Sequence, residues 1–295
     1  MQDEEERLWN QLRKAETSFV SSPSERSRLL FNLGKVLIAQ GRYKTAETVT
    51  RKLVESLEGQ GSNDNDIETL DALYLLGDVL YFQGSYIQAD KLYRRVLEGR
   101  KKVLKPKHPD ILLSMDALAN ELVAQKQYKE GEEMHRDTLA LRRDVLGPEH
   151  FDTLRSMFGL AVVLKCQDRH KESEAMHTKT LALRRNVLGP EHPGTLMSMS
   201  QLGLVLGFLG KYKEAEAMLK DALAMSNKVL GPEHRDTLIV MDHLGLVLSY
   251  QDKYEEAEAM HKKVLAISQR VLGPEHPDTL LTVKYLESLA LKQRK

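Results

Sequence analysis

The chain has 295 residues, and its 43 lysines and arginines are balanced by 43 aspartates and glutamates. Nucleic acids and anionic membranes attract proteins through an excess of positive charge, so neither is expected as a partner. The single cysteine, Cys166, excludes an intrachain disulfide framework and a cysteine-rich metal site, and it favours a reducing, cytoplasmic location.

Residues 1–26 are expected to form an N-terminal capping helix. The first stretch, MQDEEERLWNQL, is acidic where a signal peptide carries a basic and then an apolar segment. Leu8, Trp9, Leu12 and Phe19 are expected to cover the first repeat that follows. No apolar run in the chain approaches the ~20 residues of a membrane span.

Residues 27–276 are predicted to form six helical hairpins. Apolar residues recur at the i, i+3, i+4, i+7 spacing of amphipathic helices, with short breaks such as LGKY at 209–212. Residues 277–295 are expected to form a single C-terminal capping helix with a polar outer surface, which keeps a solenoid soluble. The first helices of the hairpins are expected to begin near Ser27, Leu70, Leu112, Leu154, Leu196 and Leu238.

A ten-residue sequence, VLGPEHPDTL at 271–280, marks the boundaries between hairpins. Near-copies begin at residues 103, 145, 187 and 229, so each begins 42 residues after the last. Glycine and proline stop one helix, and the residues after the histidine favour the start of the next. Successive copies would lie roughly 10 Å apart, whereas the ligands of one zinc ion lie within about 2.3 Å of it. We therefore predict neither metal nor cofactor at the repeated histidines His108, His150, His192, His234 and His276.

Small residues recur in pairs, one in each helix of a hairpin, where two backbones can approach closely. The pairs are Gly34/Ala46, Gly77/Ala89, Ala119/Gly131, Ala161/Ser173, Gly203/Ala215 and Gly245/Ala257. With the turn pattern Gly-x-Tyr, as in Gly210/Tyr212, they resemble the tetratricopeptide repeat (TPR). The period exceeds the usual 34 residues of that repeat, and the LGPEHPDTL linker is similar to the kinesin-light-chain-like branch of fungal and bacterial multidomain proteins. The resemblance implies an all-α fold, a right-handed superhelical solenoid of about six hairpins.

Some turns depart from the family pattern. His170 replaces the turn tyrosine, and Lys126, Asp168 and Asp252 replace the turn glycine.

Motifs of catalysis are missing from the sequence. It has no glycine-rich phosphate loop, no HExxH, no GxSxG and no CxxC. Cys166 and His170 lie four residues apart, but no third group completes a nucleophilic site. The basic pairs late in second helices, such as Arg142-Arg143 and Arg184-Arg185, are attributed to the helix dipole. We predict that the chain is not an enzyme.

The resemblance implies that one face of the first helices, opposite the core, lines a concave groove. In the first third this face is polar and mainly acidic, with Arg28, Phe31, Lys35, Asp71, Tyr74, Asp78, Asp116 and Asn120. Further on it becomes apolar and aromatic, with Arg155, Phe158, Val162, Lys165, Ser200, Leu204, Phe208, Asp242, Leu246 and Tyr250. Such a stripe marks an interface, or it packs against neighbouring first helices. The sequence leaves both interpretations open.

The predicted function is a protein-interaction scaffold that binds a partner peptide or helix in the groove. Aspartates in the first third would face basic partner residues, Asn120 would bond to the partner backbone, and Phe158, Phe208 and Tyr250 would hold apolar anchors. One alternative is a sensor or self-association array detached from a larger signalling NTPase. Another is binding or catalysis of a small apolar ligand in the groove.

Overall fold

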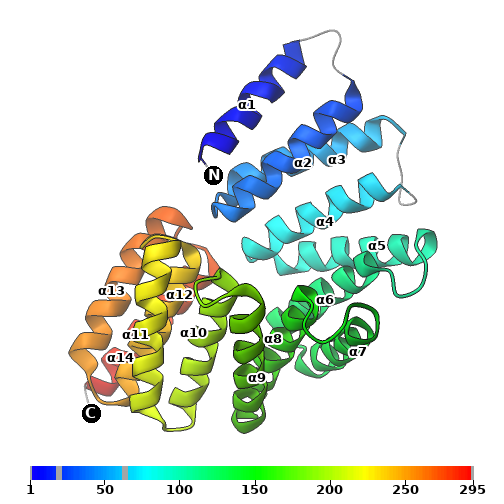
Figure 1. The fold of residues 1–295 in the computed structure, drawn as a ribbon. Helices are drawn as coiled ribbons and strands as arrows, with labels where there is room; N and C mark the ends of the chain where they lie inside the picture. The colour runs from blue at the N-terminus through cyan, green and yellow to red at the C-terminus, as the bar shows by residue number, and fades with distance from the viewer. Residues whose placement is uncertain (1, 18–21, 62–65, 294–295) are drawn as a thin grey trace. The chain divides into compact units, whose positions relative to one another are not determined.

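The computed structural model describes residues 2–17, 22–61 and 66–293. Within these ranges the chain forms fourteen α-helices and no strand, which confirms the predicted all-α class (Figure 1). The helices are α1 (Gln2–Thr17), α2 (Pro23–Ala39), α3 (Tyr43–Gly59), α4 (Ile67–Phe82), α5 (Tyr86–Val103), α6 (Pro109–Ala124), α7 (Tyr128–Leu146), α8 (Phe151–Cys166), α9 (His170–Leu188), α10 (Pro193–Phe208), α11 (Tyr212–Val229), α12 (Arg235–Tyr250), α13 (Tyr254–Val271) and α14 (Pro277–Gln293).

The chain divides into two compact units, residues 1–127 and residues 128–295. In the first unit, α2 packs with α3 and α4 with α5 as hairpins, while α1 lies on α2 and α6 on α5. In the second unit, α8/α9, α10/α11 and α12/α13 are hairpins, α7 lies on α8, and α14 lies on α13. Each unit is thus a stack of hairpins in which every helix contacts its neighbours in the chain.

The first helices of the hairpins begin three or four residues earlier than predicted, for example at Pro193 rather than Leu196. The reason is a cap that the apolar pattern does not reveal. The imidazole Nδ1 of His192 accepts the backbone N–H of Gly194 at 3.0 Å, and His234 accepts that of Asp236 at 3.1 Å. The same bond forms at His108, His150 and His276. Each histidine satisfies a backbone donor that a helix start leaves open.

The turns inside the hairpins share one backbone conformation, whatever their sequence. Gly41 and Gly210 have φ of 73° and 76°, in the left-handed region. Where the turn glycine is replaced, Lys126 keeps φ at 65° and Asp168 and Asp252 at 59°. The turn geometry therefore holds at positions where an L side chain is strained.

The small-residue pairs mark close helix contacts, as predicted. A Cβ atom added at Gly203 would lie 2.7 Å from Leu219, and one at Gly245 would lie 2.8 Å from His261. A larger side chain would therefore push the two helices of the hairpin apart.

At the N-terminus, α1 packs on α2 through Leu8 and Leu12, which are both 4% exposed. Trp9 is half-buried, and its indole N–H donates to Glu5 at 3.1 Å. These positions agree with the predicted packing role. Phe19 lies outside the described residues.

Candidate functional site

Both polar side chains of the Glu-x-His motif have structural contacts. In addition to the histidine caps, Glu191 pairs with Lys228 at 2.6 Å, and Glu233 pairs with Arg270 at 2.7 Å. Each pair joins a loop to the end of the second helix that follows it. The repeated loops thus cap the first helix of a hairpin and contact the end of its second helix. Among the described residues no group of three or more His, Cys, Asp or Glu side chains could hold a metal ion.

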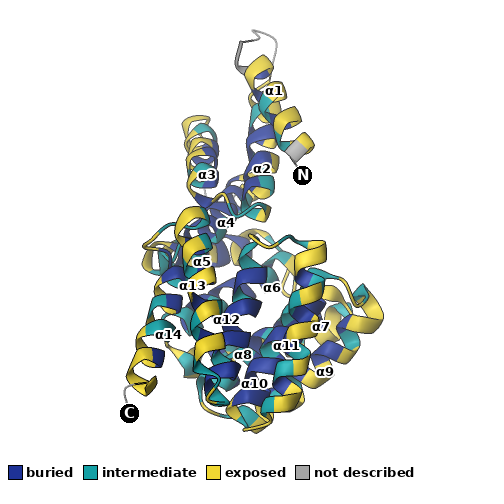
Figure 2. Ribbon diagram, turned by 90° about the vertical axis from the view of Figure 1, so that its left-hand side faces the viewer, coloured by how far each residue is buried: buried dark blue, intermediate teal, exposed yellow. Residues whose placement is uncertain are grey.

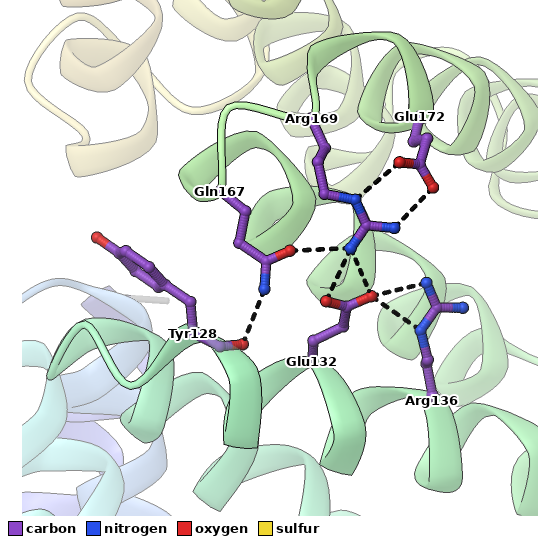
Figure 3. A network of polar contacts seen from close by, with 6 residues as sticks. All are labelled: Tyr128, Glu132, Arg136, Gln167, Arg169 and Glu172. Carbon is purple, nitrogen blue, oxygen red and sulfur yellow. Dashed lines mark hydrogen bonds and ion pairs between the residues drawn. The ribbon is translucent and has the colours of Figure 1, made fainter.

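A second set of contacts joins the hairpin turns to the preceding second helix (Figure 3). In the turn before α9, the Arg169 guanidinium binds Glu132 of α7 at 2.8 Å and Glu172 of α9 at 2.7 Å. Beside it, the side-chain amide of Gln167 donates to the backbone carbonyl of Tyr128 at 3.2 Å. Lysines take the place of Arg169 in later repeats, in the pairs Lys211–Glu174 and Lys253–Glu216.

A third repeated contact is a buried arginine near the end of the second helix. The guanidinium of Arg184 donates to the carbonyl of Gly194 at 2.7 Å and to the hydroxyl of Ser198 at 2.9 Å. Arg142 makes the equivalent bonds to Asp152 and Ser156, as does Arg100 to Asp110 and Ser114. The sequence assigned these arginines to the helix dipole. Their role is instead to hold the first helix of the next hairpin.

In the first unit, the predicted groove residues largely contact one another or nearby helices. Asp71 binds the Arg100 guanidinium at 2.6 Å, and Asp78 accepts the hydroxyl of Tyr93 at 2.7 Å. Among the remaining members, Phe31 lies beneath the Lys35 ammonium at 5.7 Å and Tyr74 beneath Arg100 at 5.0 Å. Asp116 is 1% exposed, Asn120 is half-buried, and Arg28 is exposed. The charges of Asp71 and Asp78 are therefore already engaged within the chain.

In the second unit, three predicted groove residues are buried. The helix α10 packs directly against α12, and both helices consist mostly of buried residues (Figure 2). Ser200 bonds to His243 Nδ1 at 2.8 Å, and Leu204 is 3% exposed. Asp242 is also buried; it pairs with His261 at 2.8 Å and accepts the Thr282 hydroxyl at 2.5 Å. Close approach is possible because Gly207 faces Val247: an added Cβ would lie 2.8 Å from that side chain. In this part the stripe is packing between first helices.

The other groove residues of the second unit keep some exposure. Phe208 is 39% exposed, although its ring stacks on His170 with centroids 4.9 Å apart and lies 6.0 Å from Tyr250. We call His170, Phe208 and Tyr250 the aromatic ladder. The half-buried members are Arg155, which pairs with Asp152 at 3.4 Å; Phe158, beneath the Arg184 guanidinium at 4.7 Å; Val162; and Leu246.

Lys165, the next-to-last residue of α8, lies in an environment with few acceptors. Its ammonium donates to Gln201 Oε1 of α10 at 2.9 Å and forms no ion pair with a carboxylate in the described parts of the chain. Burial lowers the pKa of Lys165. Burial also lowers the pKa of His177 and of His243 to about 3, and the Lys165 charge adds to the effect on both. Both imidazoles are therefore neutral at physiological pH, and the positive charge of Lys165 is uncompensated.

Cys166 is next to Lys165 and is half-buried. Burial raises the pKa of its thiol, even though the Lys165 charge opposes the shift. A raised thiol pKa disfavours the nucleophilic thiolate. The residues that sequence reasoning missed, Gln201, His243 and the aromatic role of His170, lack a repeat signature because each occurs in a single hairpin.

Models of the tetratricopeptide repeat match residues 27–52, 68–130, 117–186, 159–228, 209–268 and 236–294. The chain belongs to the tetratricopeptide repeat family. The resemblance expected from the sequence is confirmed, and the hairpins described above are TPR hairpins. A search of curated proteins found no match to this TPR chain. None of its described helices is long and apolar enough to cross a membrane.

Several solved structures are similar to this TPR chain. A Podosopora anserina kinesin light chain protein with nearly identical TPR-like repeats is 25% identical, with a TM-score of 0.53 over 68% of this chain and 95% of that one. NprR in complex with its cognate peptide NprX is 13% identical, with a TM-score of 0.71 over 96% of this chain and 78% of that one. A Rap protein bound to competence and sporulation factor is 12% identical, with a TM-score of 0.61 over 90% and 75%. The last two likenesses show the fold alone.

Proposed function

We propose that this chain is a non-enzymatic interaction module that binds a peptide or helix of a protein partner. The contact surface is the exposed part of the first-helix face in residues 128–295, around the aromatic ladder and Lys165. TPR arrays bind protein partners through such faces, and NprR carries a peptide in its own structure. The observation that carries the proposal is the exposed ring of Phe208, 39% of which is accessible, whereas Phe158 and Tyr250 of the same unit are half-buried.

The positive charge of Lys165 favours a partner segment that carries an acidic group. An ammonium without a carboxylate near it costs free energy, and an acidic group of a bound segment would offset that cost. His170 begins α9 directly after the turn that follows Lys165, so the ladder and the ammonium lie at the same end of the α8/α9 hairpin. We infer that the partner segment carries an acidic group beside an apolar or aromatic side chain.

The lowered pKa of Lys165 is consistent with this assignment. Because burial lowers the pKa of Lys165, the folded state disfavours the charged side chain relative to the unfolded state at pH 7. Lys165→Gln is therefore expected to leave the fold as stable or more stable. Residues that cost stability in the free protein are often kept for binding.

The test is the capture of a partner from cell extract by the immobilised chain, followed by affinity measurement with the mapped peptide. Phe208→Ala and Lys165→Gln should each weaken binding at least tenfold. Phe208→Ala should destabilise the fold by less than the roughly 3–5 kcal/mol of a fully buried phenylalanine. The controls Val187→Ala and Lys179→Gln change exposed residues of α9 and should bind normally. Unaltered binding by both test variants would refute the proposed surface.

A further inference from the structure

The last helix, α14, has an exposed strip on the side opposite its buried face. Leu280 and Leu291 are 42% and 63% exposed, and Lys284 and Glu287 between them are exposed as well. The spacing of these four residues, i, i+4, i+7 and i+11, places them on one line along the helix. Thr282 and Leu289 lie on the other side and are buried. The strip is therefore apolar at its two ends and charged in its middle, rather than polar throughout as expected for a capping helix.

Comparison with the equivalent positions of the earlier repeats shows which kind of element packs on this strip. Leu280 occupies the position of Leu238, which packs against Val264 in the second helix of its own hairpin. All five earlier residues at this position are at most 3% exposed: Leu70, Leu112, Leu154, Leu196 and Leu238. Within the part of the chain that the structure describes, no helix covers the strip of α14. The exposed residues of the strip thus occupy positions at which another helix packs in the earlier repeats.

An ordinary second helix does not fit there. Glu287 stands where the earlier hairpins have glycine or alanine, and at Gly203 and Gly245 the partner helix leaves no space for even a Cβ atom. The occupant must therefore lie farther away and must accommodate Lys284 and Glu287. Both of these side chains are exposed.

We propose that the occupant is α14 of a second copy of the chain, packed antiparallel about a two-fold axis. With the axis between Tyr285 and Leu286, Leu280 lies opposite Leu291 of the second copy, and Lys284 lies opposite Glu287. The symmetry repeats both contacts, so two apolar pairs flank two ion pairs. A parallel pairing would instead place Lys284 beside its own copy. One helix face is a small interface, so the dimer is weak and depends on concentration.

The experiment is sedimentation velocity of the full chain over a wide concentration range. The wild type should shift from a mass of 33.6 kDa towards twice that value as concentration rises. Lys284→Glu and Glu287→Lys each place like charges opposite each other, so each should weaken the dimer at least tenfold. An equimolar mixture of the two variants should recover association, because every contact between different chains is again between opposite charges. Both residues are exposed, so the melting temperature of either variant should equal that of the wild type at concentrations where the wild type is monomeric.

Three results would overturn the proposal. The first is a monomer at every concentration of the wild type. The second is a dimer that survives both single charge reversals, and the third is a mixture that associates no better than its components. This inference does not rest on the proposed peptide surface, which lies on α8 to α12.

Discussion

At the residue scale, the repeated loops are explained by backbone hydrogen bonding. The histidine of each loop caps the following helix by accepting a hydrogen bond at Nδ1, which requires the neutral imidazole with its proton on Nε2. The pattern of glycine, proline and aspartate was enough to predict a boundary at each loop. It could not predict the cap itself, because histidine is not among the residues usually preferred at that position.

The non-glycine turns provide a direct test of residue-level strain. Lys126 holds a left-handed backbone at φ 65°, a conformation that costs an L side chain roughly 1 kcal/mol. Lys126→Gly should therefore raise the free energy of unfolding by about 0.5–1 kcal/mol. The matched change Lys179→Gly, at an exposed interior position of α9, should lower it by about 1 kcal/mol. Urea titration of both variants checks the prediction, and the same sign for both would contradict it.

Glu121 of α6 predicts a dependence of stability on pH. Burial raises the pKa of this carboxyl to about 7, and the charge of Asp90 acts in the same direction while a bond from Gln125 opposes it. In the unfolded chain its pKa is near 4.5, so between about pH 4.5 and 7 the folded state binds more protons. Stability contributed by the protonated carboxyl is then lost as pH rises through this window.

Glu121→Gln removes this titration. The variant should be more stable than the wild type at pH 8, by about 1–3 kcal/mol, and should differ little from it at pH 4.5. Thermal unfolding of the two proteins at both pH values measures the difference. If the stability gain of Glu121→Gln over the wild type were equal at both pH values, or larger at pH 4.5, Glu121 would have an ordinary pKa in the folded protein.

At the element scale, the hairpins are joined by buried arginines as well as by apolar packing. Sequence reasoning predicted the hairpins, their turns and the small-residue contacts, because periodicity and size repeat in every unit, but it placed the starts of the first helices three or four residues too late. It could not predict which residue of the Arg142-Arg143 pair is buried. Arg142 is 1% exposed, whereas the side chain of Arg143 is exposed to solvent. The burial of Arg142 depends on its contacts with the following hairpin, and the local sequence pattern does not predict these contacts.

Later repeats replace the arginine together with its partner. Ser226 occupies the position of Arg184, and Val240 that of Ser198, and both are buried. Arg184→Ala should destabilise the fold by about 2–4 kcal/mol, since it leaves the Ser198 hydroxyl and the Gly194 carbonyl without their donor. The double variant Arg184→Ser/Ser198→Val should recover part of this loss. Chemical denaturation tests both. A double variant less stable than Arg184→Ala would show that the two positions are not coupled.

At the scale of the whole molecule, the apolar stripe proves to have two parts. Where α10 packs on α12 the stripe is core, as the buried Leu204 and Ser200 show. Around Phe208, Tyr250 and Lys165 it remains partly open. The sequence predicted which residues belong to this face, through the repeat register. It could not predict which of them are covered, because that depends on how closely neighbouring first helices approach, and Gly207 sets that distance.

The proposed function requires that the partner contacts the chain at the aromatic ladder. Site-specific photo-crosslinking tests it most directly, with a benzophenone amino acid at position 208 and, as a control, at the exposed position 224 on α11. A partner should crosslink from position 208 and not from 224, and Lys165→Gln should strongly reduce the crosslink. Equal crosslinking from both positions, or a captured partner that crosslinks only from 224, would contradict it.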